Sequence, residues 1–95
     1  MAQEYVSEII SMYEKIAYAQ YDRIQFAQIC QEFIDGQTLK EYKAFVYRYL
    51  VEGSYHYSPE GAISLMEREN HFIESYYEQK VDVSFCAVDI GYCCG

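Results

Sequence analysis

The stretch VYRYLVEGSYHYSPEG, residues 46–61, decides between two folds for this chain. It is rich in β-forming residues on both sides of Gly53, which could form a hairpin turn, yet its first part continues an apolar pattern of helical spacing. Ser58-Pro59-Glu60 is typical of a helix start, because serine caps free N–H groups, proline needs no hydrogen bond there and a carboxylate suits the positive helix end. We therefore expect one helix before Gly53 and another from Ser58.

Two further helices are predicted before this stretch. Apolar residues recur at helical spacing over residues 6–17, and no glycine or proline interrupts the chain before Gly36. Asp22 and Gln25 form a capping-box pattern, which places a break near residues 20–22, although one unbroken helix also fits. We expect the second helix to end at Gly36, since glycine adopts the left-handed conformation that ends many helices.

The rest of the chain is predicted to continue as helix and then to change character. Thr38 and Glu41 form a second capping box, which opens a third helix. The helix that begins at Ser58 should run to about Gln79. After Lys80 the apolar residues alternate with polar ones, which is the period of a strand; they are Val81, Val83, Phe85 and Ala87.

These elements predict a single, mainly α domain over residues 1–95. We expect a compact bundle of about four helices with a short strand-like or irregular tail over residues 81–95. The alternative is an α+β fold in which a hairpin at residues 45–57 pairs with residues 81–90, because a lone strand cannot satisfy its own backbone groups.

The charge distribution limits the possible partners. The net charge is −8 from 15 acidic and 7 basic residues, and only Arg68 and Lys80 are basic after residue 51. Direct binding to nucleic acid or to anionic membrane requires clustered Lys and Arg, so we expect neither partner. The balance favours the basic surface of another protein. No apolar run approaches the length of a membrane span and no signal peptide is evident, which predicts a cytoplasmic protein.

Four carboxylates form the first candidate binding surface. When residues 59–79 are projected as one helix, Glu60, Glu67, Glu74 and Glu78 fall close to one line and opposite a broad apolar arc. At 1.5 Å per residue this acidic ridge would be about 27 Å long, so its carboxylates could occupy a cationic nucleic-acid groove. A solvated helix face that keeps the protein soluble is the simpler reading of the same pattern.

Tyrosines form the second candidate surface. Tyr47 falls on the side of the predicted third helix that carries Lys40, Lys43 and Arg48, whereas Tyr55 and Tyr57 lie in the following loop. Because tyrosine offers a large contact area at low entropic cost, we expect Tyr47, Tyr55 and Tyr57 to anchor a partner. Packing of the loop against the core is the alternative.

Catalytic and metal-binding chemistry is not predicted. The sequence has no nucleophile beside a base, no H-E-x-x-H motif and no glycine-rich phosphate loop, so we expect no enzyme activity and no cofactor. Cys86, Cys93 and Cys94 lack the C-x-x-C spacing of zinc sites, and we expect no metal and reduced thiols.

The functional hypothesis is a small acidic inhibitor or regulator that blocks a nucleic-acid-binding surface of a target such as a defence nuclease. In size and charge the chain is analogous to small phage-encoded inhibitors of such enzymes, although no motif identifies that class. The alternatives are a cysteine-based metal or redox protein and a self-assembling structural component whose tail adds a strand to a neighbouring chain, so a homo-oligomer stays open.

Overall fold

The computed structural model describes residues 2–92, and this part of the chain is all-α with no strand. Its six helices are α1 (Ala2–Tyr18), α2 (Arg23–Ile29), α3 (Leu39–Glu52), α4 (Pro59–Arg68), α5 (Asn70–Glu78) and α6 (Val83–Tyr92). The prediction of a mainly α fold is confirmed. The count of four helices and the strand-like tail are wrong. The hairpin alternative is also wrong, because residues 45–52 belong to α3 and residues 83–90 to α6.

The predicted helix starts are confirmed by their capping hydrogen bonds. The Asp22 carboxylate accepts from the backbone N–H of Gln25 at 2.8 Å, and the hydroxyl of Thr38 accepts from that of Glu41 at 3.1 Å. Both capping boxes are complete, since the side chain of the third residue also accepts from the cap backbone. At the start of α4 the side chain of Ser58 likewise accepts from a backbone N–H, that of Gly61. These starts were predictable because each depends on only four neighbouring residues.

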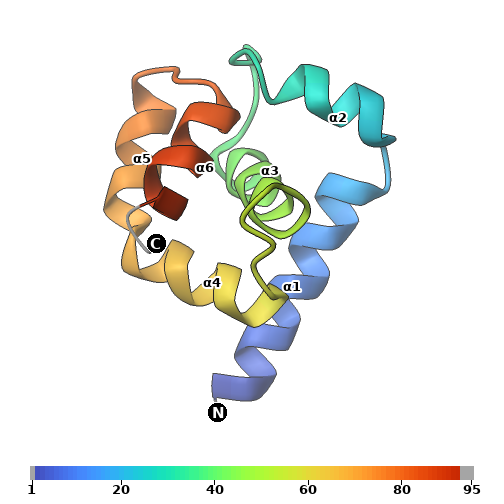
Figure 1. Ribbon diagram of the computed structural model, residues 1–95, viewed down its shortest axis with the longest axis vertical. Coiled ribbons are helices and arrows are strands. Elements are labelled where there is room, and N and C mark those ends of the chain that lie inside the picture. Colours follow the sequence, from blue (N-terminus) through green and yellow to red (C-terminus); the bar gives the residue numbers. More distant parts are fainter. Residues whose placement is uncertain (1, 93–95) are drawn as a thin grey trace.

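Helix α3 forms the centre of the fold. It packs against α1, α4, α5 and α6, which surround it in Figure 1. Consequently α3 is buried on nearly all sides, and its fully buried residues include Tyr42, Val46, Tyr47 and Leu50. A helix that is covered on nearly all sides does not show the single apolar face of an amphipathic surface helix. Its β-forming residues are apolar and can therefore be buried on several sides of α3.

Two predicted helices have different limits in the structure. Helix α2 ends at Ile29, and residues 30–37 form turns before α3, although Gly36 does adopt a left-handed φ of +85°. The helix predicted from Ser58 to Gln79 is divided at Glu69, whose φ and ψ of −102° and 21° are not helical. Helices α4 and α5 run in different directions around α3 (Figure 1), so the bend keeps both against the central helix.

The tail predicted as a strand is helix α6, and its buried residues explain why. Val83, Cys86, Ala87 and Ile90 face the core at helical spacing. Asp82 stabilises the first turn, because its carboxylate accepts from the backbone N–H of Phe85 at 2.8 Å, as an N-cap residue does.

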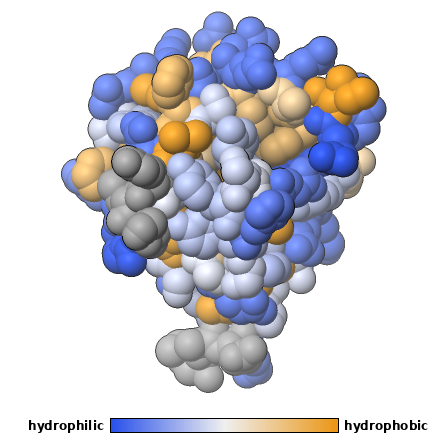
Figure 2. All heavy atoms as spheres, in the orientation of Figure 1, coloured by the Kyte–Doolittle hydropathy of each residue, from blue (hydrophilic) through white to orange (hydrophobic). Residues whose placement is uncertain are grey.

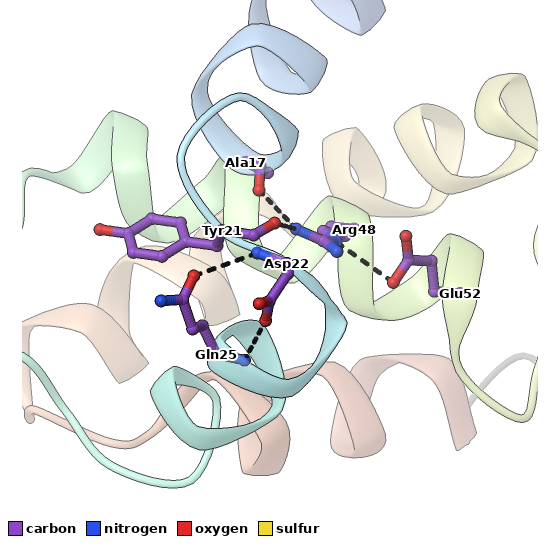
Figure 3. A network of polar contacts seen from close by, with 6 residues as sticks. All are labelled: Ala17, Tyr21, Asp22, Gln25, Arg48 and Glu52. Atoms are coloured by element: carbon purple, nitrogen blue, oxygen red, sulfur yellow. Dashed lines mark hydrogen bonds and ion pairs between the residues drawn. The ribbon is translucent and has the colours of Figure 1, made fainter.

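A buried arginine joins α1 and α2 to the central helix. The guanidinium of Arg48 donates through Nη1 to the backbone carbonyls of Ala17 at 2.6 Å and Tyr21 at 3.0 Å (Figure 3). These carbonyls lie at the end of α1 and in the turn that follows it, where helices leave backbone acceptors unsatisfied and favour a positive charge.

The same guanidinium is enclosed by two aromatic rings and one carboxylate. The Arg48 Cζ lies 4.4 Å from the ring centroid of Tyr18 and 4.3 Å from that of Phe26, so both rings stack on the cation. Its Nε is 3.1 Å from Oε1 of Glu52, an ion-pair contact without the alignment of a hydrogen bond. Arg48 is therefore structural, not part of an exposed basic face as its helical position predicted.

Exposed apolar side chains are scattered over several helices. Figure 2 shows hydrophobic groups over α2 and near α5 and α6, with more hydrophilic surface between them. The most exposed are Ile24, Phe85, Tyr5 and Phe72. In the described part of the chain no helix is both long and apolar enough to cross a membrane.

Candidate functional site

The carboxylates predicted to form one straight ridge are divided between two helices. Glu60 and Glu67 lie on α4, whereas Glu74 and Glu78 lie on α5, beyond the break at Glu69. Because α5 runs away from α4 (Figure 1), the ridge of about 27 Å that a single helix would form is not present. The four side chains therefore make up two smaller acidic groups.

Three of these carboxylates have no basic partner. Glu60, Glu67 and Glu78 are exposed, and no basic side chain in residues 4–91 pairs with any of them. Glu74 differs, because its Oε2 lies 3.7 Å from Nζ of Lys43 and accepts from Nδ2 of Asn70 at 3.2 Å. Of the four predicted carboxylates, those without a basic partner among residues 4–91 therefore lie on α4 and at the end of α5.

Tyr47 is buried, which corrects its predicted role as a partner anchor. Its side chain has no exposed surface, its ring lies 5.7 Å from that of Tyr13, and its hydroxyl donates to Oε2 of Glu14 at 3.1 Å. Burial, followed by the Glu14 carboxylate, raises the pKa of Tyr47 above its usual range. A partner cannot reach this ring unless α1 moves away from α3.

The two loop tyrosines pack against α6. Tyr57 is partly buried and its hydroxyl donates to the backbone carbonyl of Gly91 at 3.1 Å. Tyr55 stays 38% exposed, but a Cβ added at Gly91 would come within 3.0 Å of its ring. The loop therefore uses both rings to hold α6, and Tyr55 keeps a little more than a third of its surface available to a partner.

A carboxylate from α1 joins those of α4. Glu14 is exposed on α1, and both Glu14 and Glu60 contribute to the raised pKa of Tyr47. Glu67 similarly contributes to the raised pKa of Tyr13, after burial and Tyr5. We call Glu14, Glu60 and Glu67 the α1–α4 acidic face. Sequence reasoning missed Glu14, because only tertiary packing brings α1 beside α4.

A small cleft lies beside this face. It has a volume of about 130 Å³ and separates the first half of α1 from α4 and the start of α5. Its lining includes Tyr5, Ile9, Tyr13, Ile63, Met66 and Glu67. The cleft therefore combines apolar walls with a carboxylate of the acidic face.

The two described cysteines are buried thiols. Burial raises the pKa of Cys30 and that of Cys86 to about 12, so neither forms an appreciable amount of the reactive thiolate at neutral pH. Cys93 and Cys94 lie outside the described residues. Within residues 4–91, no three His, Cys, Asp or Glu side chains are grouped closely enough to hold a metal ion.

Comparison with known proteins identifies no relative. No protein-family model matches the chain, and no curated protein or solved structure matches it significantly. The class that the fold and surface define is a small, acidic, all-helical domain, and any function has to be argued from its own residues.

Proposed function

We propose that this chain is a small protein-binding inhibitor or regulator that covers a basic, nucleic-acid-binding surface of a target protein. The observation that carries the proposal is the α1–α4 acidic face, in which Glu60 and Glu67 are exposed with no basic partner among residues 4–91 and Glu14 lies on the adjoining helix α1. Unpaired surface carboxylates create a negative potential that steers a basic partner towards them. The overall charge of −8 strengthens that field.

The spacing on α4 suits occupation of phosphate positions. Glu60 and Glu67 are seven residues apart on one helix, which separates them by about 10 Å along its axis. This equals the axial rise of about three phosphates of one duplex strand, which is about 3.4 Å per phosphate along the duplex axis. Basic side chains arranged to hold phosphates could therefore pair with these carboxylates, and nucleic acid would then be excluded from the same surface.

Aromatic contact would supply the affinity that exposed charges lack. An exposed ion pair contributes only about 0–1 kcal/mol, because both groups are already well solvated. Tyr55 precedes α4 and is 38% exposed, so its ring could be buried against the same partner. Glu78 at the end of α5 would form a separate, more peripheral contact.

The two alternative functions have less support. The strand-addition form of self-assembly needs a strand, whereas residues 83–92 form α6. The cysteine-based form was predicted for Cys86, Cys93 and Cys94; Cys86, like Cys30, is a buried thiol poorly suited to metal or redox chemistry, and Cys93 and Cys94 lie outside the described residues. The acidic face has no such difficulty, since its carboxylates are exposed and charged.

The test compares capture of partners by two charge-matched baits. The first carries Glu60→Gln and Glu67→Gln, and the control carries Glu8→Gln and Glu32→Gln, which remove two exposed carboxylates that belong neither to α4 nor to the acidic face. Each bait and the unchanged protein are incubated with lysate of the source organism at low and raised salt. We expect a basic nucleic-acid-binding protein to be captured by the unchanged protein and the control, but about five- to tenfold less by the first variant.

The captured protein is then tested directly for inhibition. Its binding to labelled DNA or RNA is followed by fluorescence anisotropy while the unchanged protein or a variant is added. Competition by the unchanged protein, weakened by salt and by the α4 substitutions, would support the proposal. Equal capture by all three baits with no salt dependence would contradict it, as would a captured partner whose nucleic-acid binding is unaffected.

A further inference from the structure

The cleft beside the acidic face has the size of a side chain. Sites for drug-sized ligands and cofactors usually measure about 300–1,000 Å³, whereas this cleft measures about 130 Å³. Ile9 on α1 and Ile63 and Met66 on α4 provide apolar walls. Such walls favour a ligand with an apolar stem, because the stem loses contact with water when it enters.

The polar groups still available in the cleft are oxygens. No hydrogen bond within residues 4–91 engages the hydroxyls of Tyr5 and Tyr13 or the carboxylate of Glu67. The nitrogen donors of the lining behave differently, because both Lys43 and Asn70 direct their side-chain nitrogens to Glu74. A ligand that donates several hydrogen bonds and carries positive charge is the chemical complement of this set.

We propose that the cleft receives the guanidinium of an arginine side chain from the basic partner. This inference rests on the proposed function for the source of the arginine. The planar group offers five N–H donors, can bind the Glu67 carboxylate through two of them, and can stack on an aromatic ring such as that of Tyr5. The methylene groups of the arginine then lie against Ile63 and Met66.

Lys43 is the one cation in the lining, and its position is compatible with this assignment. Its Nζ lies 3.7 Å from the Glu74 carboxylate, and its side chain is only 20% exposed. The charge of Lys43 is thus offset by Glu74, while Glu67 keeps its own charge. When Glu74, the partner of Lys43, is counted with the lining, two carboxylates face one cation, and this excess of one negative charge attracts a guanidinium.

The test uses a short peptide and does not need the natural partner. Acetyl-Gly-Arg-Gly-amide is titrated into the ¹⁵N-labelled protein, and its citrulline analogue, a neutral molecule of nearly the same shape, is the matched probe. We expect saturable amide shifts in the first half of α1 and around the α4–α5 junction, with binding of the citrulline peptide about tenfold weaker.

Two variants locate the binding site. Glu67→Gln should weaken binding of the arginine peptide about tenfold, whereas Glu78→Gln, which removes an equally unpaired carboxylate at the end of α5, should change it less than about twofold. Tyr5 is 55% exposed, so Tyr5→Ala should leave the circular dichroism spectrum unchanged while it weakens binding severalfold.

The results separate the cleft from the proposed function. Equal binding of both peptides, or equal losses with Glu67→Gln and Glu78→Gln, would overturn the arginine site even if basic partners are still captured. The opposite result, a specific arginine site in a protein that captures no basic partner, would retain the cleft and overturn the inhibitor proposal. Shifts spread evenly over all acidic helices would also overturn the site, since they indicate unspecific attraction.

Discussion

At the scale of single residues, Arg48 shows how one side chain can join three helices. Its guanidinium satisfies carbonyls at the end of α1, stacks between the rings of Tyr18 and Phe26, and contacts Glu52. Burying a cation costs free energy unless its N–H groups are hydrogen-bonded. Arg48 donates to backbone carbonyls that would otherwise have no partner. The turn between α1 and α2 is therefore positioned by a residue of α3.

Replacing Arg48 by methionine should lower the free energy of unfolding by about 3 kcal/mol. The two carbonyls lose a charged donor and the aromatic rings lose the cation between them, although the volume is largely kept. Urea unfolding followed by circular dichroism measures the change. The control is Arg23→Met, an exposed arginine, which should cost less than about 0.5 kcal/mol. Similar stabilities for the two variants would mean that the contacts of Arg48 contribute nothing net.

At the scale of helices, local signals predicted where elements begin better than where they end. The starts at Asp22, Thr38 and Ser58 follow from a side chain and the backbone three residues later. The break at Glu69 has no such local signal, because neither glycine nor proline lies nearby after Gly61. It follows from the need of both α4 and α5 to contact α3.

Helix α6 was misread because its sequence carries two periods at once. Val81, Val83, Phe85 and Ala87 alternate as in a strand, yet Val83 also begins a helical set with Ile90 that is buried in the structure. The decisive signal was Asp82, a good N-cap residue directly before that set. Phe85 is 64% exposed, so the alternation did not correspond to a buried face.

The cap at Asp82 gives a test of α6. Asp82→Ala should lower the free energy of unfolding by about 1 kcal/mol, because the first turn of α6 loses the acceptor for the N–H of Phe85. Asp82→Asn should cost little, since asparagine caps a helix about as well as aspartate. Thermal unfolding of the two variants measures the difference. Equal losses for alanine and asparagine would show that the charge of Asp82, and not its cap, stabilises α6.

At the scale of the whole molecule, tyrosine hydroxyls connect segments that are distant in sequence. Tyr42 donates to the carbonyl of Val81, Tyr57 to that of Gly91 and Tyr77 to that of Gln37. A chain of 95 residues has a small core. Each of these tyrosines stabilises the fold in two ways, because its ring packs against the core and its hydroxyl satisfies a backbone carbonyl. Within residues 46–61, Tyr57 is explained in this way and Tyr47 by its burial and its hydrogen bond to Glu14, without a partner protein.

The acidic site was predictable as a set of residues but not as an arrangement. Charge and helical spacing selected Glu60 and Glu67, both of which are exposed and have no basic partner in the described part of the chain. The same reasoning could not place Glu14 near these carboxylates, and it could not find the cleft that Tyr5 lines. Both depend on how α1 packs against α4. Sequence reasoning also predicted that Tyr47 would be exposed. The pattern of one helix cannot show that other helices cover α3 on nearly all sides.

The buried thiols and phenols predict that the fold loses stability in alkali. The pKa of Cys30 and of Cys86 rises from the usual 9.0 to about 12 on folding, and burial raises the pKa of Tyr42 and Tyr47 above the usual 10.0. Below pH 9 these groups are protonated in both states, so their contribution is fully present. As the pH rises from 9 towards 12, the unfolded chain releases protons that the folded chain keeps, and the unfolding free energy falls.

The slope of this fall measures how many thiols stay protonated in the folded protein while they ionise in the unfolded chain. In a protein with Cys93→Ser and Cys94→Ser, the two remaining thiols should lower the free energy of unfolding by up to about 2.7 kcal/mol per pH unit between their unfolded and folded pKa values. Urea unfolding from pH 7.5 to 10 should therefore give a plateau followed by a decline that begins near pH 9. Adding Cys30→Ala and Cys86→Ala should lower the plateau, through the cavities, but flatten the decline below pH 10, where tyrosines are still largely protonated. A decline of unchanged steepness in that variant would assign the alkaline sensitivity to other groups and would mean that Cys30 and Cys86 ionise as readily in the folded protein as in the unfolded chain.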